Sequence, residues 1–128
     1  MKNTLLISTI AFLIVIVGYI FVGVWIVKDT RQIVENGMRN GSNYVGYMTE
    51  NTYAKLNPAK RGITNYESVY NPENHLYQHI RPWHLFFIAR VSLHNYYRSG
   101  ITGFNENVVL KLKLQDGRWV ATDARIKP

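Results

Sequence analysis

The most hydrophobic stretch of the chain lies at its N-terminus and carries no formal charge from Leu5 to Val27. At 1.5 Å per residue, a helix of about 23 residues spans the ~30 Å hydrocarbon core of a bilayer, and Tyr19 and Trp25 suit its interfacial side. A cleaved signal peptide has an apolar region of about 7–15 residues and an Ala-x-Ala-like site, neither of which is found here. The pattern therefore predicts a transmembrane anchor, residues 1–28, that stays attached.

The next segment, residues 29–57, is apolar on one face only. Apolar and small residues recur at intervals of three and four from Ile33 to Leu56, and charged or polar residues fill the opposite face. Asn57-Pro58 is the expected end, because proline disfavours helical geometry in the residue before it. The pattern favours one rod that leaves the membrane and continues to Leu56. A break near Asn40-Gly41-Ser42, which would split the rod into two helices, is the alternative.

Two glycines lie four residues apart on the apolar stripe of this segment, at positions 37 and 41. Each costs roughly 1 kcal/mol of helix propensity relative to alanine, so the positions need a reason. Small residues at this spacing let another helix or a sheet approach the backbone closely. We therefore expect helix packing at Gly37 and Gly41, with Met38 and Val45 as their apolar neighbours.

Residues 58–128 are expected to form a small α+β domain. Asn71-Pro72-Glu73 is typical of a helix start, and predicts a short helix that ends before Arg81-Pro82. Apolar and polar residues then alternate from Trp83 to Tyr97, which predicts one long strand. Phe86 and Ile88 lie on its less buried face and are candidates for an exposed interaction surface.

The end of the chain predicts a β-hairpin. A second strand runs from Val108 to Gln115, and Asp116-Gly117 is the signal of a type I′ turn. A third strand, Trp119 to Ile126, has Val120, Ala124 and Ile126 on one face. The predicted fold is α+β: a transmembrane helix that continues into an amphipathic helix, packed against a three- to four-stranded antiparallel sheet.

Composition limits the class of protein. The chain has 128 residues, enough for one domain, and 47% of them are hydrophobic, too many for a disordered basic tail. Its net charge of +7 lies outside the apolar run, and suits an anionic lipid surface, a cell-wall polymer or simply a solvated face. Without cysteine, the chain cannot form disulfides, thiolate zinc sites or cysteine nucleophiles.

Residues that could carry chemistry are few. His75 and His79 stand four apart on the predicted short helix, but the acid of a His-Glu-x-x-His site is missing. Ser92 and His94 could meet Asp123 across the sheet, but no nucleophile or phosphate-binding motif supports an enzyme. Lysines, arginines and tyrosines are scattered without a nucleic-acid motif. We expect no catalytic, cofactor or metal site, and no nucleic acid as partner.

The layout of a membrane helix, an amphipathic helix and an antiparallel sheet resembles pilins and pilin-like proteins, most closely the TadE-like group of tight-adherence and related systems. That group similarly leaves the membrane through a polar turn with a glutamine, followed by an Asn-small pair and an Arg-x-Gly-small segment that ends in an aromatic residue. The corresponding residues here are Val24-Trp25-Ile26-Val27-Lys28-Asp29 and Thr30 to Tyr44. The chain departs from prepilins because only four residues precede the apolar run and no glutamate lies within it.

The resemblance implies a non-enzymatic structural or assembly subunit of a pilus, secretion or conjugation system, such as a minor pseudopilin. The implied partners are the lipid bilayer, other envelope subunits and further copies of the chain. The expected location is the bacterial cytoplasmic membrane, with a single pass and the C-terminal domain outside. Cations such as Lys28 and Arg31 after the anchor favour the opposite orientation, but domains longer than roughly 60 residues translocate largely regardless of charge.

A second resemblance concerns Val108 to Ile126. This segment is similar to the last hairpin of cone-shaped domains of the nuclear-transport-factor kind. It implies a membrane-tethered ligand-binding or immunity module as the alternative function. The implied pocket would be lined by Phe86, Ile88 and Trp119.

Overall fold

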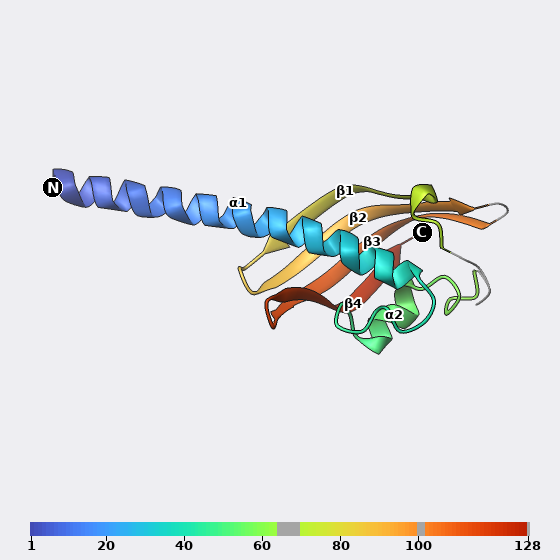
Figure 1. Cartoon of the computed structure of the whole chain (residues 1–128). Coiled ribbons are helices and arrows are strands. Elements are labelled where there is room, and N and C mark those ends of the chain that lie inside the picture. Colours follow the sequence, from blue (N-terminus) through green and yellow to red (C-terminus); the bar gives the residue numbers. More distant parts are fainter. Residues whose placement is uncertain (64–69, 100–101, 128) are drawn as a thin grey trace.

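The computed structural model describes residues 1–63, 70–99 and 102–127 (Figure 1). The protein is α+β, with a long apolar N-terminal helix and a four-stranded antiparallel sheet of order β1-β2-β3-β4. The elements are α1 (Lys2–Met38), α2 (Glu50–Leu56), the 3-10 turn η1 (Pro72–Asn74), β1 (His75–His84), β2 (Ile88–Ser99), β3 (Thr102–Gln115) and β4 (Arg118–Lys127).

Helix α1 has two halves in different surroundings. Residues 2–21, the bare half, are almost entirely exposed, and all but the last few of them extend beyond the sheet (Figure 1). Residues 22–38, the core half, cross the inner face of the sheet, which curves so that both edge strands, β1 and β4, contact the helix. Ile26 and Ile33 of the core half are completely buried. The same helix therefore belongs both to the apolar extension and to the core of the domain.

The predicted continuous rod is wrong, and the alternative of two helices is confirmed. α1 ends at Met38, and α2 begins at Glu50. Gly41 and Gly46 in the connection have φ angles of 109° and 87°, which L residues with a side chain rarely adopt. The hydroxyl of Thr49 caps α2 by accepting the N–H of Thr52, and α2 ends before Asn57-Pro58 as predicted.

The region around β1 also differs from the prediction. The helix-start signal at Asn71 is used, because its side chain accepts the N–H of Glu73, but only the single turn η1 forms. From His75 the chain is the edge strand β1, where Pro82 is tolerated because an edge strand can lack a ladder donor. The predicted strand from Trp83 to Tyr97 is broken by a turn at residues 85–87, so it contributes to both β1 and β2.

The β3–β4 hairpin is confirmed. Asp116 and Gly117 both have positive φ angles, 53° and 76°, as a type I′ turn requires. The register of β4 shifts by one residue near Thr122, which changes the side of the strand that faces α1. Ala124 therefore points inward and Val120 does not, so the prediction that they share one face is wrong. The inward residues of β4 and its neighbours form the core with α1 and α2: Ile26, Ile33, Val34, Tyr53, Leu56, Val91, Leu93, Val108, Leu110, Leu112, Trp119, Ala121 and Ala124.

Candidate functional site

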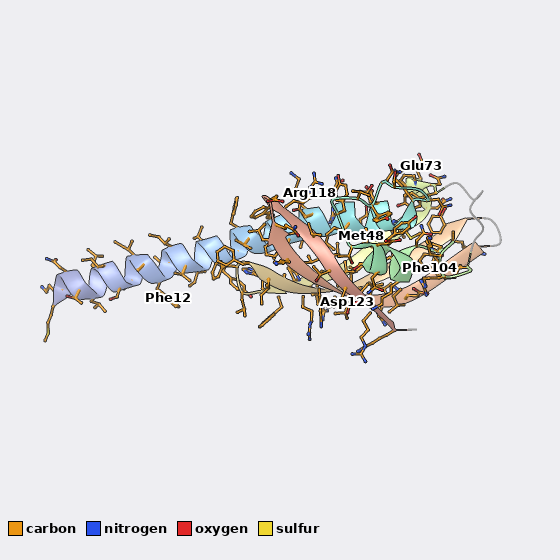
Figure 2. The ribbon with its side chains drawn as sticks, turned by 90° about the horizontal axis from the view of Figure 1, so that it is seen from below. Phe12, Met48, Glu73, Phe104, Arg118 and Asp123 are labelled. Carbon is orange, nitrogen blue, oxygen red and sulfur yellow. The ribbon has the colours of Figure 1, made fainter. Side chains whose placement is uncertain are left out.

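The bare half of α1 is the most prominent surface feature of the molecule. Figure 2 shows side chains, Phe12 among them, pointing away on all sides from the part of this half that extends beyond the sheet. Phe12 is 65% exposed and Phe21 is 71% exposed. The helix is long and apolar enough to cross a membrane. This half therefore fits the anchor of a single-pass membrane protein or a signal anchor.

The turn between β1 and β2 meets α1 where the bare half ends. We call residues 83–88 the hairpin tip. The Nε2 atom of His84 donates a hydrogen bond to the carbonyl of Tyr19 at 2.9 Å, and its Nδ1 atom accepts the N–H of Phe86 at 3.1 Å. The rings of His84 and Tyr19 stack with centroids 3.9 Å apart. One buried histidine therefore holds the tip against α1 and shapes the turn, in which Phe86 has a φ of 64°.

The hairpin tip exposes large apolar side chains to solvent. The interaction candidates Phe86 and Ile88 both lie here, 39% and 52% exposed. Sequence reasoning missed Trp83, Leu85 and Phe87, which are at least as exposed. Their signal was present, because a run of exposed consecutive apolar residues is unusual unless it serves a function. The tip and the bare half of α1 together form one apolar end of the molecule.

A groove lies behind the tip, on the sheet face that points away from α1. It has a volume of about 680 Å³. Trp83, Arg90 and Lys111 follow one another across β1, β2 and β3, and Ile88 lies opposite Lys113. The remaining lining residues are Ala89, Leu112 and Thr122. The groove therefore combines two large apolar side chains with three cations.

The helix-packing candidates are divided between two places. Gly37 is buried, and a Cβ atom there would lie 3.2 Å from Cδ1 and 3.3 Å from Cβ of Leu56, so α2 approaches α1 at this glycine. Met38 beside it is also buried. Gly41 and Val45 lie in the connection instead, where a Cβ on Gly41 would meet nothing within 4 Å and Val45 is 66% exposed. The helix break explains the difference, because it ends the stripe at Met38.

A cluster of titratable groups lies at the opposite end of the sheet, where the core half of α1 ends. The hydroxyl of Tyr77 donates to Oε1 of Glu35 at 2.9 Å. Burial and this hydrogen bond raise the pKa of Tyr77 to about 12. His75 hydrogen-bonds Asn95 and Tyr70, and burial lowers the pKa of His75. Burial likewise raises the pKa of Tyr70, so these groups stay uncharged near neutral pH and serve to join α1 to β1 and β2.

The histidine pair does not form on a helix. His75 and His79 lie on β1 on either side of a register shift, with His75 buried and His79 exposed at a φ of 55°. Within residues 1–63, 70–99 and 102–127, no group of three or more His, Cys, Asp or Glu side chains could hold a metal ion.

The three residues considered for a hydrolytic triad have other surroundings. Nδ1 of His94 contacts Oδ1 of Asn107 at 3.1 Å, and Oδ1 of Asp123 accepts from Nζ of Lys55 at 2.6 Å. That hydrogen bond lowers the pKa of Asp123. Ser92 is exposed on β2.

The residues of the implied ligand pocket point in different directions. Trp119 is fully buried on the inner face of the sheet, where its backbone N–H donates to Oδ2 of Asp29 and its ring contacts Trp25. Ile88 lies on the outer face. A single pocket lined by both would have to pass through the sheet.

Comparison of the chain with protein-family models, curated proteins and solved structures gives no match.

Proposed function

We propose that this chain is a non-enzymatic, single-pass membrane protein that serves as a structural or assembly subunit of a bacterial envelope complex, such as a pilus, secretion or conjugation system. The observation that carries the proposal is the continuity of α1. One unbroken helix supplies both the bare apolar half and the centre of the folded domain. The domain is then held at a fixed height and angle relative to the bilayer.

Two features favour an anchor that is retained over a signal sequence that is removed. Ile26 is fully buried in the core of the domain, and the carbonyl of Tyr19 accepts a hydrogen bond from Nε2 of His84. Cleavage at the end of the apolar run would remove Tyr19 and Ile26 from the domain. It would leave a cavity in the core and a buried histidine without its partner, and both are destabilising.

A rigid junction suits an assembly subunit. Neighbouring subunits of a filament or secretion channel need a constant relation between their membrane and aqueous parts. Here the bare half offers apolar side chains around its whole circumference, so lipid and the helices of other subunits can share it. We assign the domain to the extracytoplasmic side, where a pilus or secretion complex is built.

The test uses the absence of cysteine, which makes single-cysteine variants unambiguous. Phe12, Leu13, Ile14 and Val15 are consecutive on the bare half and sample every direction around the helix. We expect at least one cysteine variant in this set to give a defined crosslink, to a second copy or to an envelope subunit, in intact cells. Asn51→Cys on α2 is the exposed control, and should not crosslink within the membrane.

Two results would overturn the proposal. The first is a mature chain whose N-terminus, by mass spectrometry, begins after the bare half. The second is an intact anchor that gives no crosslink from any of the four positions. In that case the domain acts alone, as the ligand-binding or immunity alternative requires.

A further inference from the structure

We propose that the hairpin tip and the groove behind it form a second membrane contact. In this arrangement the tip enters the interfacial layer of the bilayer that holds α1, and the groove binds the phosphate of an anionic phospholipid headgroup. The inference depends on the proposed function in one respect only, that α1 spans the membrane.

Tyr19 sets the depth of the tip. The tip is fixed to this residue by the hydrogen bond from His84, by the stacking of the two rings, and by Phe86, whose ring centroid is 6.0 Å from that of Tyr19. At the other end of the bare half, Lys2 carries a charge that the hydrocarbon core disfavours. The helical rise places about 26 Å between Lys2 and Tyr19, close to the ~30 Å thickness of that core. With Lys2 at one interface, Tyr19 and the tip lie at the other.

The side chains of the tip suit an interfacial layer. Trp83, Leu85 and Phe87 are 59%, 57% and 70% exposed, although they lie on a folded domain. Among the described residues of the strands and their turns, Leu76, at 50%, is the only exposed large apolar side chain outside the tip. Contiguous exposed apolar side chains mark an interaction surface, and tryptophan is enriched at membrane interfaces. The apolar exposure of the sheet is therefore concentrated at the end that faces the bare half.

The groove adds charge complementarity. Arg90, Lys111 and Lys113 are exposed, and no carboxylate is among the residues that line the groove. The guanidinium group of arginine can bind two phosphate oxygens, and lysines close to an anionic leaflet are attracted to it. Trp83 and Ile88 stand beside the cations, where the glycerol and upper acyl region of a lipid would lie.

A partner subunit is the competing occupant. Its surface would have to present an anionic layer directly above an apolar one, at the depth that α1 sets for the tip. An anionic leaflet has these two layers everywhere on its surface. The bilayer is therefore the occupant that the geometry favours.

The test places the full-length chain in lipid nanodiscs at one copy per disc. Phe87→Cys carries an environment-sensitive fluorophore, and Glu73→Cys, exposed at the far end of the domain, is the control. We expect the label at position 87 to emit at shorter wavelength, to resist iodide quenching and to be quenched by headgroup-level nitroxide lipids. The label at position 73 should behave in the opposite way. Leu85→Cys replaces Phe87→Cys if the circular dichroism spectrum shows that the latter is misfolded.

The second arm tests the groove with discs of phosphatidylcholine alone or mixed with phosphatidylglycerol. We expect spin-labelled phosphatidylglycerol to be enriched over phosphatidylcholine at the wild-type domain. Lys111→Gln and Lys113→Gln should each reduce this preference about fivefold, whereas Lys127→Gln, on the last strand away from the groove, should not. Equal competition by inorganic phosphate would identify a free-anion site and overturn the headgroup assignment.

The outcomes separate this inference from the proposed function. If α1 is lipid-embedded but the label at position 87 remains in water, the inference fails and the anchor stands. If protection of position 87 requires two copies per disc, the occupant is a second copy and the inference also fails. If α1 itself does not enter the disc, the proposed function fails first.

Discussion

The two halves of α1 are built from similar residues and meet opposite surroundings. Ile33 of the core half is fully buried in the core of the domain, whereas Ile14 of the bare half is 66% exposed. Hydrophobicity alone does not distinguish these positions, because both need a nonaqueous environment. The two halves differ in how apolar residues are distributed around the helix. The bare half is apolar all round, as a helix in lipid is, and the core half is apolar on the face that meets protein. One helix thus combines a half that fits lipid with a half that packs against protein.

The largest effect should come from matched truncations in the two halves. Ile33→Ala should lower the free energy of unfolding of the domain by about 2–5 kcal/mol, because it leaves a cavity in a closed core. Ile14→Ala should leave the same transition unchanged, because the side chain contacts only the surrounding lipid or detergent. Urea titration in mild detergent, followed by tryptophan fluorescence, measures both. Equal losses at the two positions would mean that the bare half packs against the domain.

Glycine positions give the next contrast. Gly37→Val should lower the free energy of unfolding by roughly 1–3 kcal/mol, because new methyl groups must displace Leu56 of α2. Gly18→Val should be close to neutral, since a Cβ there meets nothing within 4 Å. The same urea titration tests the pair. A neutral Gly37→Val would show that α2 is free to move away from α1.

A smaller effect is expected at the far end of the core half. Tyr77→Phe removes the hydrogen bond to Glu35 and should lower the free energy of unfolding by about 1 kcal/mol. Tyr19→Phe, at the other end of the contact between α1 and the sheet, keeps the backbone carbonyl to which His84 donates. It should therefore lower the free energy of unfolding by less than Tyr77→Phe does. A loss at Tyr19 equal to that at Tyr77 would assign a structural role to the Tyr19 hydroxyl.

The smallest effect concerns pH. Burial lowers the pKa of His75 in the folded chain below its ordinary value of about 6.5, so the unfolded chain binds the proton more readily. The contribution of neutral His75 to the free energy of unfolding is complete above about pH 6.5 and is lost as the pH falls below it. Between pH 7.5 and pH 6 we expect the Tm to drop by a few degrees. His75→Gln should reduce the pH dependence of the Tm, whereas His79→Asn, at an exposed site, should leave it unchanged. The opposite result would assign the pH dependence to His79.

Much of the fold was predictable because its signals are local. Asp116-Gly117 favours a type I′ turn whatever surrounds it, and Asn57-Pro58 ends a helix because of the steric demands of proline. A run of 23 uncharged residues predicts a membrane segment. The hairpin tip was not predictable in this way. Its turn contains neither glycine nor proline, and it depends on His84 reaching Tyr19, which is 65 residues away in the sequence.

The inward faces show the same limit. Alternation predicted Val120 on the same face as Ala124 and Ile126, but the register shift near Thr122 reverses the faces within β4. The residue types around Thr122 do not predict a bulge. For the candidate site, sequence reasoning found Phe86 and Ile88 as leftover apolar residues, but not the turn that brings Trp83, Leu85 and Phe87 beside them.

The contact between Asp29 and Trp119 joins positions separated by 90 residues. At about 5–20 residues per second, the ribosome needs on the order of ten seconds to add the strands that cover the core half after that half has been made. During this interval, one face of the core half has no sheet to lie against. Folding of the chain therefore includes a waiting period in which Ile26 and Ile33 must be shielded by something other than the strands that finally cover them.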